Sequence, residues 1–373
     1  MKYILQLSYV VLLGLLASCS DANQPKNGQI KISLDKDMDK EVKMSSLFPN
    51  VNVVNLHEDP NKPMGEIAEM KNDESFYYCL DYQKTSISVF DRQGENVGQV
   101  NSVGHGANEY ITIADFDTDK GLLYVLCLPS KILVFNDRLE LANTIRLNET
   151  YSRICVSDEK IYVYSDQRQC ISLVNHDNGT TKDIYTSTLY PYMPKSEIPV
   201  FHKTRYHLLF ANEAGNEVLK IEATNVAQLF EIDYTDKDMV LDRYANPPVI
   251  QGKEEHEKYS SPQIYAIQET DSCYIMVYSY AWLYRICNIS KITHKILTDG
   301  CLMNVGPIPN SQNMGHLYGF RYSDQFRPLF IPNDEIEAKS NGVETTFIED
   351  VSDILLKIIT SSTKFLHSSI IYL

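Results

Sequence analysis

The chain has 373 residues, a formal net charge of −15 at pH 7 and 43% hydrophobic residues. This length allows one large domain or two of ordinary size, and an acidic surface argues against nucleic acids and anionic membranes as partners. The eight cysteines contain no C-x-x-C pair, so the sequence favours neither a disulfide framework nor a zinc site.

The first 18 residues predict a secretory signal. They carry one positive charge, at Lys2, followed by an apolar run that is too short to span a bilayer. The run ends in L-A-S-C, residues 16–19, which resembles the lipobox of bacterial lipoproteins, where cleavage leaves the cysteine as the lipid-bearing N-terminus. The alternative is an ordinary signal peptide with a chance cysteine. We therefore predict lipidation at Cys19, a lipidated flexible tether over residues 19–29, and an outer-membrane location facing the periplasm or the cell surface.

A pair of apolar runs repeats along the chain. A tyrosine-rich run recurs at residues 76–81, 122–127, 161–166, 207–212, 274–279 and 317–322, and each is followed about a dozen residues later by a second run. Equivalent positions in the second runs are Phe90, Phe135, Val174, Ile221, Cys287 and Phe330, which lie 45, 39, 47, 66 and 43 residues apart. Four of these five steps are close to the ~40–50-residue period of propeller blades, and the runs have the β-branched and aromatic composition of strands.

These repeats predict an all-β fold: a single six-bladed β-propeller of four-stranded antiparallel blades over residues 30–373. Residues 29–35 are expected to supply a strand that closes the ring against the last blade, because closure removes exposed sheet edges. An insertion near residues 236–262 is expected to form a loop or lid that either contacts a ligand or is only a long surface connection. Residues 333–373 depart from the repeat and are not placed. Two adjacent β-sandwiches are the competing fold, although they do not require a constant period.

The segment V-N-S-V-G-H-G-A-N-E-Y, residues 100–110, is rich in glycine. It is not a phosphate loop, because a β-branched strand follows it rather than a helix and the motif's lysine is absent. We expect Gly104 and Gly106 to provide positive φ in a tight crossing between blades, Glu109 to accept backbone amides, and Tyr110 to pack under the next blade with its hydroxyl satisfied.

Together with the repeat, this segment resembles the "6-bladed beta-propeller" lipoprotein family of Bacteroidetes, an NHL-like propeller with a G-x-G-P-x-E-Y element. Gly104, Gly106, Glu109 and Tyr110 match the element, whereas Ala107 stands where proline is usual. The resemblance covers about residues 45–335 and implies a six-bladed scaffold, but it implies little chemistry.

No metal or catalytic site is predicted. The stretch D-F-D-T-D-K-G, residues 115–121, has alternating carboxylates, but its glycine is seventh and Leu126 is twelfth, which does not fit the calcium loop of an EF-hand. Alternating aspartates on the polar side of a strand explain it better, and calcium or another divalent metal is the alternative. The chain has no H-x-H, H-E-x-x-H or G-x-S-x-G pattern.

A row of aromatic residues is the candidate ligand-binding feature. Period-two spacing would set Tyr278, Tyr280, Trp282 and Tyr284 on one side of a strand, where they could line a channel or a rim. The alternative is a structural row that packs in the core.

The leading functional hypothesis is a non-enzymatic binding or scaffold module at the outer membrane, with a carbohydrate, peptide or protein partner. The alternative is a metal-dependent hydrolase or lyase of the six-bladed propeller type with a site at the central channel. An enzyme is expected to gather carboxylate, Asn or His side chains from at least three blades at one end of the channel. A scaffold is expected to have aliphatic or unclustered polar residues there.

Overall fold

The computed structural model describes residues 29–32, 41–42, 52–57, 59–64, 67–81, 83–187, 200–212, 216–234, 262–280, 283–302, 317–320, 328–330, 345–349, 355–358 and 369–372. Every regular element in these ranges is a β-strand. The same ranges hold no helix of sufficient length and apolarity to span a bilayer.

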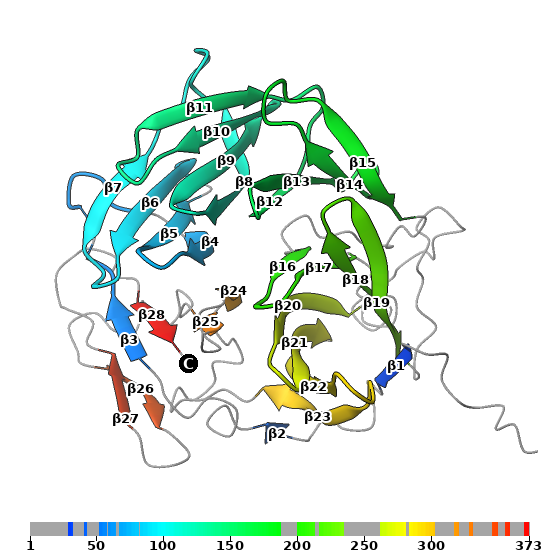
Figure 1. The fold of residues 1–373 in the computed structure, drawn as a ribbon. Helices are drawn as coiled ribbons and strands as arrows, with labels where there is room; N and C mark the ends of the chain where they lie inside the picture. Colours follow the sequence, from blue (N-terminus) through cyan, green and yellow to red (C-terminus); the bar gives the residue numbers. More distant parts are fainter. Residues whose placement is uncertain are drawn as a thin grey trace, which may run out of the picture.

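Five four-stranded antiparallel sheets form the blades of a propeller (Figure 1). Blade 1 is β4 (Ile67–Asn72), β5 (Phe76–Asp81), β6 (Ser86–Asp91) and β7 (Asn96–Val100). Blade 2 is β8 (Thr112–Asp119), β9 (Leu122–Leu128), β10 (Lys131–Phe135) and β11 (Leu141–Arg146). Blade 3 is β12 (Arg153–Ser157), β13 (Lys160–Ser165), β14 (Cys170–Val174) and β15 (Thr181–Thr186). Blade 4 is β16 (Phe201–Lys203), β17 (Leu208–Ala211), β18 (Glu217–Glu222) and β19 (Asn225–Tyr234). Blade 5 is β20 (Gln263–Glu269), β21 (Cys273–Tyr280), β22 (Leu283–Ser290) and β23 (Ile296–Leu302).

The first strand of each blade faces the centre of the ring and the fourth lies at the rim (Figure 1). The predicted equivalent positions Phe90, Phe135, Val174, Ile221 and Cys287 all fall on the third strand of their blade. The prediction of a propeller with antiparallel four-stranded blades is therefore confirmed in these five units.

The predicted number of six blades was wrong, because the described residues form five blades of four consecutive strands. Among those residues, the sixth unit supplies β24 (Leu317–Phe320) and β25 (Pro328–Phe330), and its first run is an edge strand rather than a second strand. These strands join β28 (Ser369–Tyr372) and β3 (Asn52–Asn55) from remote parts of the chain. The sequence repeat indicates strands that pair with their neighbours in the chain. This sheet also requires β3 and β28, which lie near opposite ends of the chain, to pair with each other.

Two strands of the N-terminal segment pair with the outermost strands of blades 4 and 5. β1 (Gln29–Ile32) runs parallel to β19, and β2 (Glu41–Val42) runs parallel to β23. Residues 29–35 were expected to close the ring against the last blade, but β1 extends blade 4 instead. Ile30 and Ile32 are 1% and 0% exposed and pack in the core between blades 4 and 5. β26 (Thr345–Glu349) and β27 (Leu355–Ile358) form a separate antiparallel pair.

Apolar side chains fill the interfaces between neighbouring blades. Phe116 and Tyr110 of blade 2 and its entry segment pack with Tyr78 and Val89 of blade 1, for example. Burial of this apolar area is the main term that holds the blades side by side. It also fixes the innermost strands next to one another around the centre, where the buried Asp115, Asp117 and Arg153 lie.

Candidate functional site

Six charged side chains meet on the innermost strands of four neighbouring blades. We call this set the central charge ring: Glu69 and Lys71 on β4, Asp115 and Asp117 on β8, Arg153 on β12, and Lys203 on β16. The register between first and second strand shifts between Ile67 and Glu69 in blade 1 and between Ile113 and Asp115 in blade 2. A β-bulge re-aims the side chains that follow it, and here it directly precedes the first charged residue of each strand.

The two aspartates of the ring connect blade 2 with its neighbours on both sides. Asp115 Oδ1 lies 2.7 Å from Lys71 Nζ of blade 1, and its Oδ2 accepts a 2.8 Å hydrogen bond from Ile154 N of blade 3. Asp117 Oδ2 accepts a 2.6 Å hydrogen bond from Val156 N and lies 2.6 Å from Lys203 Nζ of blade 4. Each carboxylate therefore satisfies a backbone amide at the open edge of β12 and pairs with a lysine from another blade.

Burial and mutual proximity shift the titration of the ring. Burial and the nearby charge of Asp115 raise the pKa of Glu69 to about 7, against the opposing effect of Lys71. Burial alone would lower the pKa of Lys71, but the carboxylates of Asp115, Glu69 and Asp117 outweigh it and raise that pKa. Burial would raise the pKa of Asp117, but Lys203 and Lys71 outweigh it and lower that pKa. Near neutral pH the Glu69 carboxyl is therefore close to its midpoint, beside a Lys71 whose pKa is raised and an Asp117 whose pKa is lowered.

Water reaches only part of the ring. The side chains of Lys71 and Lys203 are each 22% exposed and that of Glu69 is 20% exposed, whereas Asp115 and Asp117 are 2% and 9% exposed. A ligand that approaches the centre would therefore meet parts of the Lys71, Lys203 and Glu69 side chains.

The alternating aspartates of residues 115–121 hydrogen-bond to the neighbouring blade 3. Besides Asp115 and Asp117, Asp119 Oδ2 accepts a 3.2 Å hydrogen bond from Glu159 N of blade 3. All three side chains therefore face the same neighbour, as the strand period requires. Within the described residues, no group of three or more His, Cys, Asp or Glu is placed to hold a metal ion.

The glycine-rich motif forms a compact turn between blades 1 and 2. Glu109 Oε2 accepts a 2.7 Å hydrogen bond from Gly106 N. A Cβ at Gly104 would lie 2.1 Å from Glu109 Oε2, and one at Gly106 would lie 3.0 Å from it. Positive φ was the expected reason for these glycines, and that was wrong: the described glycines with positive φ are Gly94, Gly98, Gly121 and Gly179. Space for the Glu109 carboxylate is the reason instead.

Tyr110 anchors the same turn. It is 1% exposed, and its hydroxyl donates a 2.8 Å hydrogen bond to Thr85 O and accepts a 3.3 Å bond from Ser102 N. From blade 2, Lys131 Nζ donates to Ala107 O at 3.2 Å and to Glu109 O. The four motif residues thus lie together, and the contacts described for them are within the turn and to adjacent strands.

The aromatic row does not lie on one strand. Tyr278 and Tyr280 end β21, Tyr284 belongs to β22, and Tyr280 pairs with Leu283 across the hairpin. The chain reverses direction between Tyr280 and Leu283, which breaks the period-two spacing on which the row was based. Tyr278 is fully buried and donates a 3.0 Å hydrogen bond to Asp299 Oδ1, which also accepts from the buried Arg285 through Oδ2 at 3.0 Å. Tyr280 and Tyr284 are placed by their backbone only.

Three further predictions fall outside the described residues. These are lipidation at Cys19, the role of Trp282 and the insertion near residues 236–262, of which only Pro262 is described.

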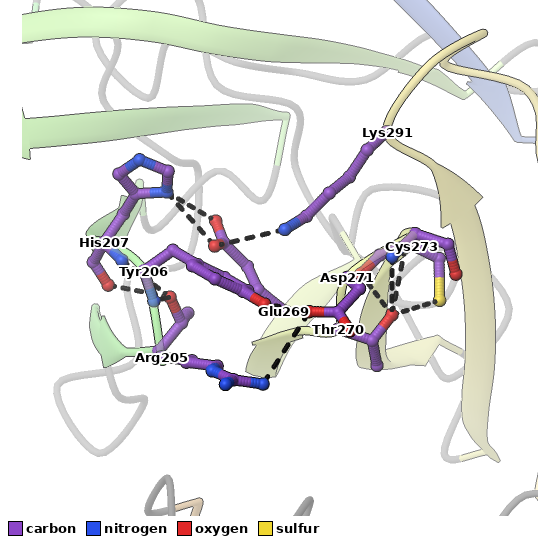
Figure 2. A network of polar contacts seen from close by, with 10 residues as sticks. Arg205, Tyr206, His207, Glu269, Thr270, Asp271, Cys273 and Lys291 are labelled. Carbon is purple, nitrogen blue, oxygen red and sulfur yellow. Dashed lines mark hydrogen bonds and ion pairs between the residues drawn. The ribbon is translucent and has the colours of Figure 1, made fainter. Parts of the chain in front are cut away.

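A second polar network joins blades 4 and 5 on one face (Figure 2). The buried Glu269 carboxylate lies 3.1 Å from His207 Nδ1 and 3.5 Å from Lys291 Nζ. Lys291 Nζ also lies 4.2 Å from the centroid of the Tyr206 ring, and the Tyr206 hydroxyl donates to Asp271. This network fixes three turns, at residues 204–207, 270–273 and 291–295, against one another.

Sequence reasoning did not identify the lysines of the central charge ring or the blade 4–5 network. A signal for the ring was present, since polar residues alternate in two of the strands that precede tyrosine-rich runs, E-M-K (69–71) and D-F-D (115–117). The partners lie 39 or more residues apart in the chain, so spacing alone does not reveal the pairs.

Comparison with known proteins supports the general kind of fold. The model of a family described as "Domain of unknown function (DUF4934)" matches residues 28–341. A solved structure described as a "Putative exported protein" from Bacteroides fragilis aligns with a TM-score of 0.63 at 13% identity, over 92% of this chain and 98% of that one. A member of the DUF4221 family from Bacteroides vulgatus aligns with a TM-score of 0.47 at 9% identity, over 86% of this chain and 95% of that one. No curated protein matches.

Proposed function

We propose that this chain, which belongs to the family described as Domain of unknown function (DUF4934), is an exported, lipid-anchored propeller of the outer membrane that binds a carboxylate-bearing ligand without transforming it. Export is supported by the apolar N-terminal run and by the description of the B. fragilis neighbour as an exported protein. Anchoring through Cys19 is supported by the lipobox-like L-A-S-C.

The observation that carries the binding proposal is the exposure pattern of the central charge ring. Lys71 and Lys203, on blades 1 and 4, are the most accessible cations of the ring, each with 22% of its side chain exposed. Both act on the same carboxylate, since each lowers the pKa of Asp117. A ligand carboxylate that reaches the centre would accept charge-assisted hydrogen bonds from these two groups. Acidic carbohydrates and acidic peptides both carry this chemistry.

We do not carry the hydrolase or lyase hypothesis further, because no specific observation favours it. The carboxylates of the ring come from two blades rather than three, and Asp115 and Asp117 are each held by a lysine and a backbone amide.

The test is isothermal titration calorimetry with two matched pairs of probes: digalacturonate against galactobiose, and diglutamate against diglutamine. We expect the acidic member of one pair to bind and its neutral counterpart not to bind. Lys203→Met should weaken this binding at least tenfold, whereas Lys120→Met, at a lysine that is 61% exposed outside the ring, should leave it unchanged. Absence of binding by both acidic probes, or equal affinity of the two variants, contradicts the proposal.

The pKa of Glu69 adds a prediction about pH. Below pH 7 this carboxyl is mostly protonated, which removes one negative charge from beside Lys71. We therefore expect the affinity for the acidic probe to rise as the pH falls from 8 to 6. Glu69→Gln should remove this dependence and bind at pH 8 about as tightly as the natural protein does at pH 6. An unchanged pH profile in Glu69→Gln would exclude Glu69 as the titrating group.

A further inference from the structure

The face that carries the blade 4–5 network also carries exposed apolar side chains. Ile292, in the turn before β23, is 89% exposed, Leu297 on β23 is 62% exposed, and Tyr206 is 42% exposed. Lys291 Nζ lies over the Tyr206 ring at 4.2 Å, and Arg205 Cζ lies 5.3 Å from its centroid. We call these five residues, Arg205, Tyr206, Lys291, Ile292 and Leu297, the blade 4–5 patch.

The direction of β1 relates this patch to the N-terminal segment. In an antiparallel blade the turn between the first and second strands lies at the same end of the sheet as the turn between the third and fourth. The turn at 204–207 therefore shares an end with the turn at 223–224, where β19 begins. Because β1 runs parallel to β19, the N-terminal end of β1 points back toward this end of blade 4. Gln29, where the described residues begin, is thus the end of β1 that lies toward the face that holds the patch.

The length of the upstream chain is sufficient to reach that face. Gln29 is paired with Glu231, the seventh residue of β19, so the end of the sheet is about 20 Å away at about 3.3 Å per residue. Nine residues lie between Cys19 and Gln29, and they can span up to about 30 Å. A lipid on Cys19 would therefore reach just beyond the face.

We infer that this protein contacts the lipid bilayer that anchors it through the blade 4–5 patch. The inference relies on the anchoring of Cys19 in the proposed function. Isoleucine and leucine side chains insert into the boundary between headgroups and acyl chains, and tyrosine is enriched at that depth. Lysine and arginine can lay their apolar stems along such a surface while their charged ends stay in the aqueous headgroup region. Three apolar side chains are too few to bind a membrane alone, so the lipid supplies the affinity and the patch sets the orientation.

The chemistry points to a neutral bilayer surface rather than to an anionic one. The chain carries a net charge of −15, which repels anionic headgroups. Within the patch, Arg205 lies 3.7 Å from Asp271 and Lys291 lies 3.5 Å from Glu269, so its cations are already paired with carboxylates. Apolar contact is therefore the main attraction, and the orientation should change little with salt concentration.

The test compares two labelled positions on opposite faces of the lipidated full-length protein. Ile292→Cys lies in the patch, and Ile111→Cys replaces the same residue type, 54% exposed, at the connection from blade 1 to blade 2 on the other face. Each carries an environment-sensitive fluorophore, and the protein is reconstituted in phosphatidylcholine vesicles that contain a spin-labelled lipid. The unsubstituted protein gives the background, since five of the six described native cysteines are buried.

We expect quenching of the label at position 292 to exceed that at position 111 by at least twofold, in 0.1 M and in 0.5 M salt. Equal quenching at the two positions, or stronger quenching at 111, would overturn the inference. Flotation of the unsubstituted protein with the vesicles tests the anchoring separately. If it does not float, the Cys19 proposal fails, and the same two labels on protein held by an N-terminal hexahistidine to nickel-chelating vesicles still decide the orientation.

Discussion

At the scale of single residues, the Glu109 side chain explains why positions 104 and 106 are both glycine. Its carboxylate occupies the space that a Cβ at Gly104 would take and bonds to Gly106 N. Gly104→Ala should displace this carboxylate and lose the hydrogen bond, at a cost of about 1 kcal/mol in the free energy of unfolding. Urea denaturation measures the change.

A double-mutant cycle separates this explanation from a general effect of the substitution. Glu109→Ala should cost about as much as Gly104→Ala, and the double variant should cost no more than either. Additive losses would show that alanine at position 104 disturbs the turn independently of Glu109.

His202 predicts a pH dependence of stability. It is 7% exposed, burial lowers its pKa to about 3, and its Nε2 has no hydrogen-bond partner among the residues that the structure describes. In the unfolded chain this pKa is about 6.5, so the unfolded state binds the additional proton between these values. The contribution of neutral His202 is therefore present above pH 6.5 and is lost as the pH falls toward 3.

The natural protein should lose roughly 2 kcal/mol more than His202→Leu between pH 6.5 and 4.5, at about 1.4 kcal/mol per unit of pKa shift. Comparing the two proteins removes the opposite dependence expected from Glu69, whose raised pKa makes stability fall as the pH rises through 7. His176→Leu, at an exposed turn, is the control and should follow the natural protein. Parallel curves for all three would show that His202 is protonated in the folded state.

At the scale of elements, aspartates of β8 accept hydrogen bonds from backbone amides at the edge strand β12 of blade 3. Asp117 pairs with Lys203 and accepts from Val156 N. Asp117→Asn leaves the largely buried ammonium group without its carboxylate, and we expect a loss of about 2 kcal/mol, below the value for a fully buried pair because Lys203 is partly exposed. Thermal and urea unfolding measure this loss.

Asp119→Asn, on the same strand and with a longer bond to Glu159 N at 3.2 Å, is the matched control and should cost under about 1 kcal/mol. Asp117→Asn combined with Lys203→Met should be more stable than Asp117→Asn alone, because the unpaired charge is gone. A double variant that is the least stable of the set would contradict the assignment of the loss to Lys203.

The same strand shows what could be predicted from the sequence. The alternation of Asp115, Asp117 and Asp119 indicated a strand with one polar side, and this was correct because strand period is a local property. The bonding partners were not predictable, because they are backbone amides of blade 3 that carry no sequence signal. Similarly, the prediction of a single aromatic row was wrong because the chain reverses between Tyr280 and Leu283, within an unbroken run of strand-forming residues.

At the scale of the whole molecule, the repeat predicted the ring but not its closure. Phe90, Phe135, Val174, Ile221 and Cys287 mark third strands because each blade folds from consecutive residues. The strands β3 and β28 pair although they stand near opposite ends of the chain, and no local pattern reports such a pair. The central charge ring could not be predicted from a local pattern either, since its side chains come together only once four blades are assembled.

The attachment of β1 to blade 4 makes a last prediction about the whole ring. Ile30 and Ile32 fill the core between blades 4 and 5 with Phe230 and Met276, so the N-terminal segment seals an interface that the blades alone would leave open. Ile32→Ala should create a cavity there and lower the free energy of unfolding by about 3 kcal/mol. Lys31→Ala, at the exposed residue between them, should change it by less than about 0.5 kcal/mol. Urea unfolding of the two variants side by side is the measurement. If they are equally stable, β1 covers the rim without contributing to the core, and the anchor would then hold the propeller through a segment that can detach.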